Sequence, residues 1–152
     1  MIKVIECPRD AMQGLREFIP TARKAAYLQQ LLGCGFDTLD FGSFVSPKAI
    51  PQLRDTSEVL AQLDLGRTAT KLLAIVANTR GAVDALKHSE IDYLGYPFSV
   101  SETFQLRNTN ATLADSIDRV ARIQDLCLAA DRAMVVYLSM GFGNPYGDPW
   151  NV

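Results

Sequence analysis

Residues 71–77 read Lys-Leu-Leu-Ala-Ile-Val-Ala, a continuous apolar stretch near the middle of the chain. Strands of antiparallel sheets often alternate apolar with polar residues, whereas a strand of a parallel sheet is covered on both faces and stays apolar throughout. The stretch therefore predicts a buried parallel strand. Asn78 follows it directly, and residues 80–87 have the pattern of a short helix.

The same unit of a strand followed by a helix recurs on both sides of this stretch. We expect further strands at residues 3–7, 38–41, 91–98 and 133–138. Pro8 should end the first of them, with a loop through Met12, Gln13 and Gly14. One helix should begin at Pro20–Thr21, and Thr56–Ser57 should cap a second helix that runs toward Leu63. The longest helix should begin at Thr112, in a capping-box pattern with Asp115, and face inward through Leu113, Ile117, Val120, Ile123 and Cys127.

Strict alternation of strands and helices predicts an α/β fold with a parallel sheet and right-handed crossovers. An open doubly wound sheet and part of an eight-stranded barrel both fit, and periodicity does not choose between them. The dinucleotide-binding version of the open sheet has no support, because no G-x-G-x-x-G follows the first strand.

Length and composition narrow the class of protein. The 152 residues favour one domain, and an apolar share of 48% is ample for a buried core. A formal net charge of −2 gives no general attraction for nucleic acid or for an anionic membrane surface. The start of the chain has no leader pattern, so a cytoplasmic protein is expected. The cysteines are three, without a C-x-x-C pair, and His88 is the single histidine, so neither a disulfide framework nor a two-imidazole site is supported.

Polar residues gather directly after the expected strands. In parallel α/β folds the carboxyl ends of the strands form the functional face, so these residues predict a polar site there. Each also has a structural explanation. Arg9 and Asp10 can form a rim ion pair, Asp40 can pair with Arg9, and Asn78 can cap a helix. Glu102 can be a solvated loop residue.

Three ordered blocks of sequence resemble the hydroxymethylglutaryl-CoA lyase family. Residues 6–14, Glu-Cys-Pro-Arg-Asp-Ala-Met-Gln-Gly, are similar to the family's P-R-D-G-L-Q opening. Residues 43–52, Ser-Phe-Val-Ser-Pro-Lys-Ala-Ile-Pro-Gln, match its S-F-V-S-P-K-x-x-P-Q stretch, which is the more specific block. Residues 101–104 with Asn108 and Asn110 resemble its S-E-x-F and N-x-N pattern, and residues 137–139 and 144–146 resemble its fifth strand and loop.

The resemblance implies a TIM (β/α)8 barrel, here incomplete with about five βα units, in which residues 1–152 are the amino-terminal part of one lyase-type domain. It implies cleavage of 3-hydroxy-3-methylglutaryl-CoA to acetyl-CoA and acetoacetate with a divalent cation, Mg²⁺ or Mn²⁺. Asp10 matches the metal-ligand aspartate and Arg9 the arginine that stabilises enolate charge. Gln13 matches a glutamine that lies near the metal and near the arginine. Asp40 stands where the family usually has Glu, which leaves the charge but shortens its reach.

The remaining roles that the resemblance implies concern the acyl-CoA substrate. Asn78, Glu102, Asn108 and Ser139 are expected beside the substrate, and Arg16 and Lys48 are candidates for the CoA phosphates. The partner is thus an acyl-CoA, with no nucleic acid and no membrane, and the full-length enzyme is expected to be a homodimer.

The family's site also takes a His-x-His pair, an asparagine ligand and a lid cysteine from later segments, and none of these lies in the 152 residues. A complete barrel ordinarily needs about 250 residues. We therefore expect a truncated lyase that is inactive alone and binds Mn²⁺ weakly or not at all. Two alternatives stay open. One is a related Claisen-type acyltransferase or a lyase for another 3-hydroxyacyl-CoA, and the other is a non-catalytic barrel fragment that pairs with a second chain.

Overall fold

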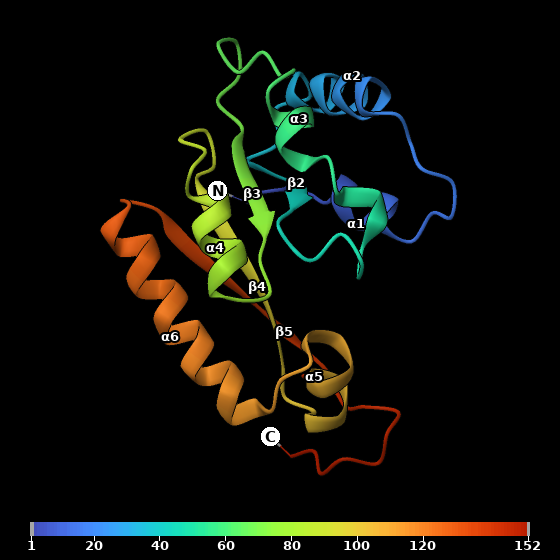
Figure 1. Cartoon of the computed structure of the whole chain (residues 1–152), viewed down its shortest axis with the longest axis vertical. Helices are drawn as coiled ribbons and strands as arrows, with labels where there is room; N and C mark the ends of the chain where they lie inside the picture. Colours follow the sequence, from blue (N-terminus) through green and yellow to red (C-terminus); the bar gives the residue numbers. More distant parts are fainter. Residues whose placement is uncertain (1, 152) are drawn as a thin grey trace.

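Strands and helices alternate along the chain in the computed structural model, which describes residues 2–151. The strands are β1 (Ile5–Glu6), β2 (Thr38–Ser43), β3 (Lys71–Ile75), β4 (Tyr93–Ser99) and β5 (Ala133–Ser139). The helices are α1 (Pro8–Gln13), α2 (Thr21–Leu32), α3 (Thr56–Leu60), α4 (Thr79–Ala85), α5 (Glu102–Thr109) and α6 (Leu113–Ala129), with a 3-10 turn, η1, at Pro51–Leu53 (Figure 1). None of the helices within residues 2–151 is both long and apolar enough to cross a membrane.

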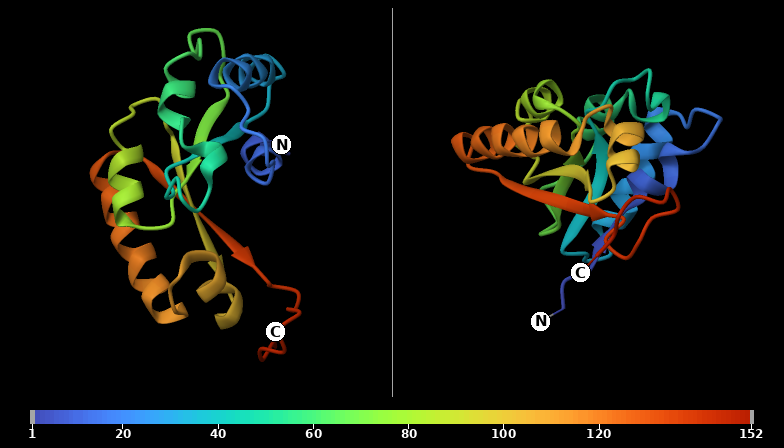
Figure 2. Two further views of the ribbon diagram at one scale, coloured as in Figure 1. Left: turned by 45° about the vertical axis from the view of Figure 1, so that its right-hand side comes forward. Right: turned by 90° about the horizontal axis from the view of Figure 1, so that it is seen from below.

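The sheet decides between the two architectures that the sequence left open. Its strands lie in the order β1-β2-β3-β4-β5, and every neighbouring pair is parallel. A doubly wound sheet reverses direction at a switch point, whereas a barrel adds each new strand on the same side. The sheet is also curled, with α4 and α6 on its convex side (Figure 2). The fold is therefore an incomplete TIM barrel, as predicted.

Alternate residues of each strand serve the two faces of the curled sheet. Leu72, Ala74 and Val76 pack with the helices in the main hydrophobic core, and so do Leu39 and Phe41 of β2. The residues between them face the concave side, which is the barrel interior. There β2 places a carboxylate, Asp40, and β3 and β4 place the apolar Ile75 and Pro97. The alternation along the strands thus places the hydrophobic core on the convex face of the sheet and polar side chains such as Asp40 on the concave face.

Two helices were not expected from the sequence, and both carry residues of the site. The segment predicted to be a loop after Pro8 is α1, which begins with Pro8 in its first turn and ends before Gly14. Proline suits this position because the first turn needs no backbone donor and proline fixes the backbone angle φ near its helical value. The second unexpected helix is α5, which Ser101 caps by accepting a hydrogen bond from Phe104 N at 3.2 Å.

The starts of α2, α3 and α6 and the buried face of α6 agree with the sequence predictions in part. The capping box of Thr112 and Asp115 is confirmed, with Thr112 Oγ1 3.0 Å from Asp115 N. The start of α2 at Thr21 is confirmed as well. Asp55, and not Thr56 or Ser57, is the N-cap residue of α3. The inward position of Ile117 is wrong, because its side chain is 60% exposed while the neighbouring Ser116 is fully buried.

Candidate active site

Helix α1 carries three of the predicted site residues on one face. Arg9 and Gln13 lie four residues apart, which places their side chains next to each other on a helix. Arg9 Nη1 donates to Gln13 Oε1 at 3.0 Å and to Asp10 Oδ1 at 3.0 Å. Gln13 Nε2 in turn donates to Asp10 Oδ1 at 3.3 Å. The short helix therefore joins a guanidinium, a carboxylate and an amide in one hydrogen-bonded group.

Asp40 of β2 holds the other edge of the same guanidinium. Arg9 Nη2 lies 2.6 Å from Asp40 Oδ2, and Arg9 Nε lies 3.1 and 3.2 Å from the two carboxylate oxygens. The Asp40 side chain is fully buried, and that of Arg9 is 12% exposed. The strand register shifts between Asp40 and Gly42, a local irregularity that often lies beside active sites. A two-point contact of this kind fixes the plane of the guanidinium.

Burial acts against the charge of Asp40 while Arg9 supports it. Burial, with the negative charge of Asp10 adding to it, raises the pKa of the Asp40 carboxyl above its ordinary value, while the hydrogen bonds and charge of Arg9 offset part of that rise. An arginine keeps its proton in proteins, so the pair is held as ions by the guanidinium. Burying this carboxylate opposes folding, because a charged group loses its favourable contact with water. A cost of this kind at a strand end indicates a functional position.

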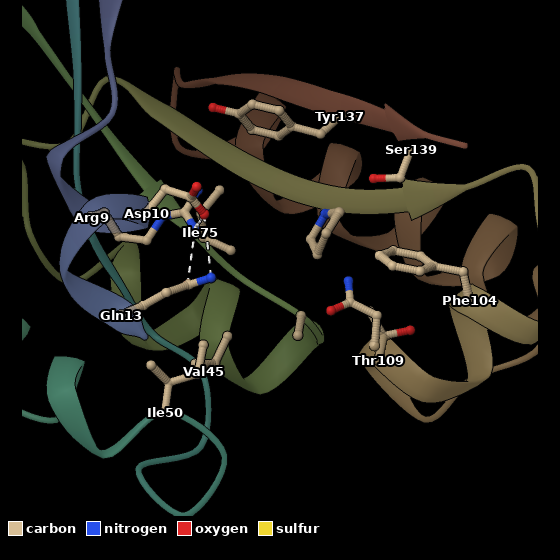
Figure 3. A pocket seen from close by; sticks show the side chains of 13 residues that line it. Arg9, Asp10, Gln13, Val45, Ile50, Ile75, Phe104, Thr109, Tyr137 and Ser139 are labelled. Carbon is tan, nitrogen blue, oxygen red and sulfur yellow. Dashed lines mark hydrogen bonds and ion pairs between the residues drawn. The ribbon is translucent and has the colours of Figure 1, made fainter. Parts of the chain in front are cut away.

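A cavity of about 320 Å³ opens beside this group at the carboxyl ends of the strands. Arg9, Asp10 and Gln13 line one side of it, and β5 and α5 line the opposite side (Figure 3). Between them lies an apolar wall that includes Val45, Ile50, Ile75 and Pro97. The arrangement places one fixed cation and one exposed carboxylate at the edge of a partly apolar cavity.

Of the residues predicted beside the substrate, three line this cavity or the groove that continues from it. Asn108 lines both, and Ser139 lines the cavity. Asn78 caps α4, its Oδ1 accepting a hydrogen bond from Gly81 N at 2.9 Å, and also lines the groove, whose volume is about 800 Å³. The capping interpretation of Asn78 is thus confirmed, and a role toward substrate stays a prediction.

Three other predicted residues are not brought into this group. Glu102 is the first residue of α5, and its Oε2 accepts a hydrogen bond from Leu113 N at 3.0 Å. It is therefore not the solvated loop residue considered above, and it does not line the cavity. Arg16 and Lys48 are exposed and line neither the cavity nor the groove. Their assignment to the CoA phosphates stays a prediction.

Tyr137 is the main cavity residue that the sequence did not single out. Burial, and then the negative charge of Asp40, raise the pKa of its phenol to about 12. It lies two residues before Ser139 on β5, and residues two apart on a strand share a face. The two-residue spacing from Ser139 is the sequence feature that could have identified Tyr137 as a site residue. Thr109 and Phe104 were missed because α5 was not expected as a helix.

Among the described residues, one exposed carboxylate at the edge of the cavity is available to bind a metal cation. The side chain of Asp10 is 65% exposed, and the amide of Gln13 lies beside it. Within residues 2–151 no group of three or more histidine, cysteine, aspartate or glutamate side chains is placed to hold a metal ion. Carboxylate and amide oxygens suit hard divalent cations, so Asp10 fits as one member of a ligand set and not as a complete site.

Comparison with curated proteins points to one family. No protein-family profile matches the chain. A Pseudomonas aeruginosa enzyme named 3-hydroxy-3-isohexenylglutaryl-CoA/hydroxymethylglutaryl-CoA lyase is 30% identical over 95% of this chain and 48% of its own length. The Bacillus subtilis hydroxymethylglutaryl-CoA lyase YngG is 33% identical over 91% of this chain and 46% of its own. The mitochondrial enzyme of Mus musculus is 30% identical over 95% and 44%. The chain thus spans about half the length of these relatives.

Solved structures agree with the sequence comparison. A Bacillus subtilis HMG-CoA lyase superposes with a TM-score of 0.92 and 30% identity, over 99% of this chain and 50% of that one. An Acinetobacter baumannii HMG-CoA lyase in complex with coenzyme A and 3-methylmalate superposes with a TM-score of 0.90 and 30% identity, over 99% and 49%. Nearly every described residue therefore has a counterpart in the amino-terminal half of these barrels.

Proposed function

Because this chain is homologous in sequence and fold to the amino-terminal half of the hydroxymethylglutaryl-CoA lyases, we propose that residues 1–152 form the first part of a single TIM-barrel domain in such a lyase. The enzyme cleaves 3-hydroxy-3-methylglutaryl-CoA to acetyl-CoA and acetoacetate. The observation that carries the proposal is the Arg9 guanidinium, fixed by buried Asp40 and presented to a cavity at the strand ends.

Arg9 supplies the charge that the reaction needs. When the bond between C2 and C3 breaks, the C3 hydroxyl gives its proton to a base and becomes a ketone, and the electron pair of the bond passes to C2 as a thioester enolate. Uptake of a proton at C2 then gives acetyl-CoA. A guanidinium that is always charged and held in one plane stabilises this developing charge without rearranging during the step. Asp40 fixes its Nε edge and Gln13 its Nη1 edge. Both act by orienting Arg9.

Asp10 is the residue that would hold a divalent cation, Mg²⁺ or Mn²⁺. Its exposed carboxylate fits one ligand position, and substrate oxygens and groups outside residues 2–151 would complete the set. A bound cation would lower the cost of the alkoxide at the substrate hydroxyl. Arg9 lies 3.0 Å from the same carboxylate, so its charge and that of the cation act on neighbouring parts of the substrate.

The groove that continues from the cavity is the place for the CoA portion of the substrate. Asn78, Asn108 and Asn110 line it, together with two cations, Arg107 and Arg119. Arginines suit phosphate groups because their donors match two oxygens at once. A relative of known structure is in complex with coenzyme A, which supports an acyl-CoA ligand. A cytoplasmic location and a homodimer stay predictions, and several relatives are named as mitochondrial enzymes.

A chimera tests the proposal directly. Residues 1–150 of this chain would replace the matching half of the Bacillus subtilis lyase, whose barrel superposes with a TM-score of 0.92. With Mn²⁺ and 3-hydroxy-3-methylglutaryl-CoA, the chimera should release acetoacetate and acetyl-CoA, and Arg9→Gln should abolish most of this activity. A folded chimera that cleaves nothing, or that keeps its rate without Arg9, would contradict the proposal.

A lyase for another 3-hydroxyacyl-CoA is the second candidate. The Pseudomonas aeruginosa relative is named for the isohexenyl as well as the methyl substrate, which differ in the substituent on C3. The cavity wall of Val45, Ile50 and Ile75 is apolar, as a longer hydrocarbon substituent requires. The same chimera, given both thioesters in competition, separates the two candidates by the product that forms faster. Acetyl-CoA with 2-keto acids tests the Claisen-type alternative in parallel.

A further inference from the structure

Helix α5, which forms one wall of the cavity, is held at its amino end by a residue far along the chain. The carboxylate of Asp148 accepts three hydrogen bonds there. Ser101 Oγ donates to Oδ2 at 2.5 Å, Thr103 N donates to Oδ2 at 3.0 Å, and Thr103 Oγ1 donates to Oδ1 at 2.8 Å. A carboxylate at this end of a helix also interacts favourably with the helix dipole. Asp148 and Ser101 thus accept the hydrogen bonds of two backbone donors of the first turn, Thr103 N and Phe104 N.

Asp148 is itself held in place by the loop that follows β5. Asn144 Nδ2 donates to Asp148 O at 3.0 Å, and Asp148 N donates to Asn144 Oδ1 at 3.1 Å. Tyr146 extends the contact along α5, with its ring centroid 6.4 Å from that of Phe104 and 4.8 Å from the Arg107 guanidinium. The loop, residues 144–148, therefore contacts the first two turns of α5.

The opposite side of α5 is held by Gln105, whose side chain is fully buried. Gln105 Oε1 accepts from Ser99 N at 2.7 Å, which ties the helix to the end of β4. Its Nε2 donates to Ser116 Oγ at 2.8 Å and to Thr109 Oγ1 at 2.9 Å. Gln105 thus fixes the middle of the helix from inside, while the first turn depends on the loop.

We propose that Asp148 is a positioning residue, which fixes α5 so that Phe104, Asn108 and Thr109 line the cavity. In naming that cavity as the acyl-CoA site, the inference rests on the function proposed above. Asp148 does not line the cavity. Its effect on a ligand passes entirely through the placement of the helix.

The test compares Asp148→Asn with Asp125→Asn, a matched change at an exposed site on α6, in the chain of residues 1–152. Backbone amide exchange should rise about tenfold in α5 of Asp148→Asn and stay unchanged in α6, since losing a helix cap shifts a local equilibrium by roughly that factor. In a Thr103→Val background the same change should have a smaller effect, because one of its partners is already gone.

Binding of 3-hydroxy-3-methylglutaryl-CoA to the chimera described above, in its Arg9→Gln form so that little thioester is cleaved, gives the second readout by calorimetry with Asp148 intact or changed to Asn. Its Kd should rise by about the same factor as the exchange in α5. Unchanged exchange in α5, an equal rise in every helix, or an unchanged Kd with α5 loosened would each overturn the positioning role. If the chimera with Asp148 intact does not bind the thioester while α5 still loosens in Asp148→Asn, Asp148 positions the helix as inferred and the function proposed for the cavity fails.

Discussion

Arg9 Nη2 lies 2.6 Å from Asp40 Oδ2, across a separation of 31 residues in the chain. The contact joins α1 to β2, which belong to different βα units, and it sets the position of the guanidinium at the cavity. Nε shares the carboxylate, and Nη1 is taken by Gln13 and Asp10. Every part of the Arg9 head group therefore has a partner before any ligand arrives. The guanidinium therefore needs little rearrangement during a reaction.

Asp40→Asn should lower the free energy of unfolding by about 3 kcal/mol, because it leaves the largely buried guanidinium of Arg9 without its counter-ion. Asp10→Asn is the matched control. The Asp10 side chain is 65% exposed, so its loss should change stability by no more than about 0.5 kcal/mol. Urea denaturation of the two variants gives both values. Equal stabilities would show that the buried pair contributes little to the fold.

Arg9→Gln in the chimera should lower kcat by at least about a hundredfold, the usual cost of losing a group that stabilises transition-state charge. Arg9→Lys should not restore the rate, because an ammonium lacks the planar fork that contacts Asp40 and Gln13 together. Arg23→Gln on the exposed side of α2 is the control. Steady-state kinetics with the thioester give kcat for the two Arg9 variants and for the control. Near-normal kcat in Arg9→Gln would remove Arg9 from the chemistry, and near-normal kcat in Arg9→Lys would show that a positive charge is enough without the planar fork.

Gly81→Ala should destabilise the chain by about 2 kcal/mol, as overpacking in a close contact does. A Cβ at Gly81 would collide with the backbone carbonyl oxygen of Phe44, which belongs to the loop after β2 and has little freedom to move. At Gly141 an added Cβ meets nothing within 4 Å, so Gly141→Ala serves as the control. Thermal denaturation of both variants should therefore show a lower Tm for Gly81→Ala alone.

Tyr137 should stay neutral to higher pH than an ordinary tyrosine. Burial, followed by the charge of Asp40, raises the pKa of its phenol to about 12, against about 10 in an unfolded chain. The unfolded chain then releases its proton first, so stability should fall as the pH rises between these two values. The tyrosinate absorbance of the chain minus that of Tyr137→Phe isolates the residue, with Tyr27→Phe as an exposed control. A difference curve centred near pH 10 would contradict this.

The predictions from sequence were strongest where a local pattern has one physical outcome. The apolar stretch at residues 71–77 became β3, and the capping box at Thr112 became the start of α6. The loop predicted after Pro8 was wrong because proline can either end a strand or occupy the first turn of a helix. Ile117 was placed inward on spacing, but the small Ser116 is the buried residue there, and it contacts Gln105 of α5.

By itself, the sequence determined the alternation of strands and helices, the family resemblance and the polar residues at the strand ends, because each depends on residues that are close along the chain. The tertiary structure alone decided the order of strands in the sheet, which separates the barrel implied by the resemblance from the open sheet that periodicity left possible. It also decided between the explanations that the sequence offered for Asp40, which binds Arg9, and it brought Tyr137 to the cavity and Asp148 to the first turn of α5. These contacts join residues far apart in sequence, and they form only when successive βα units pack side by side.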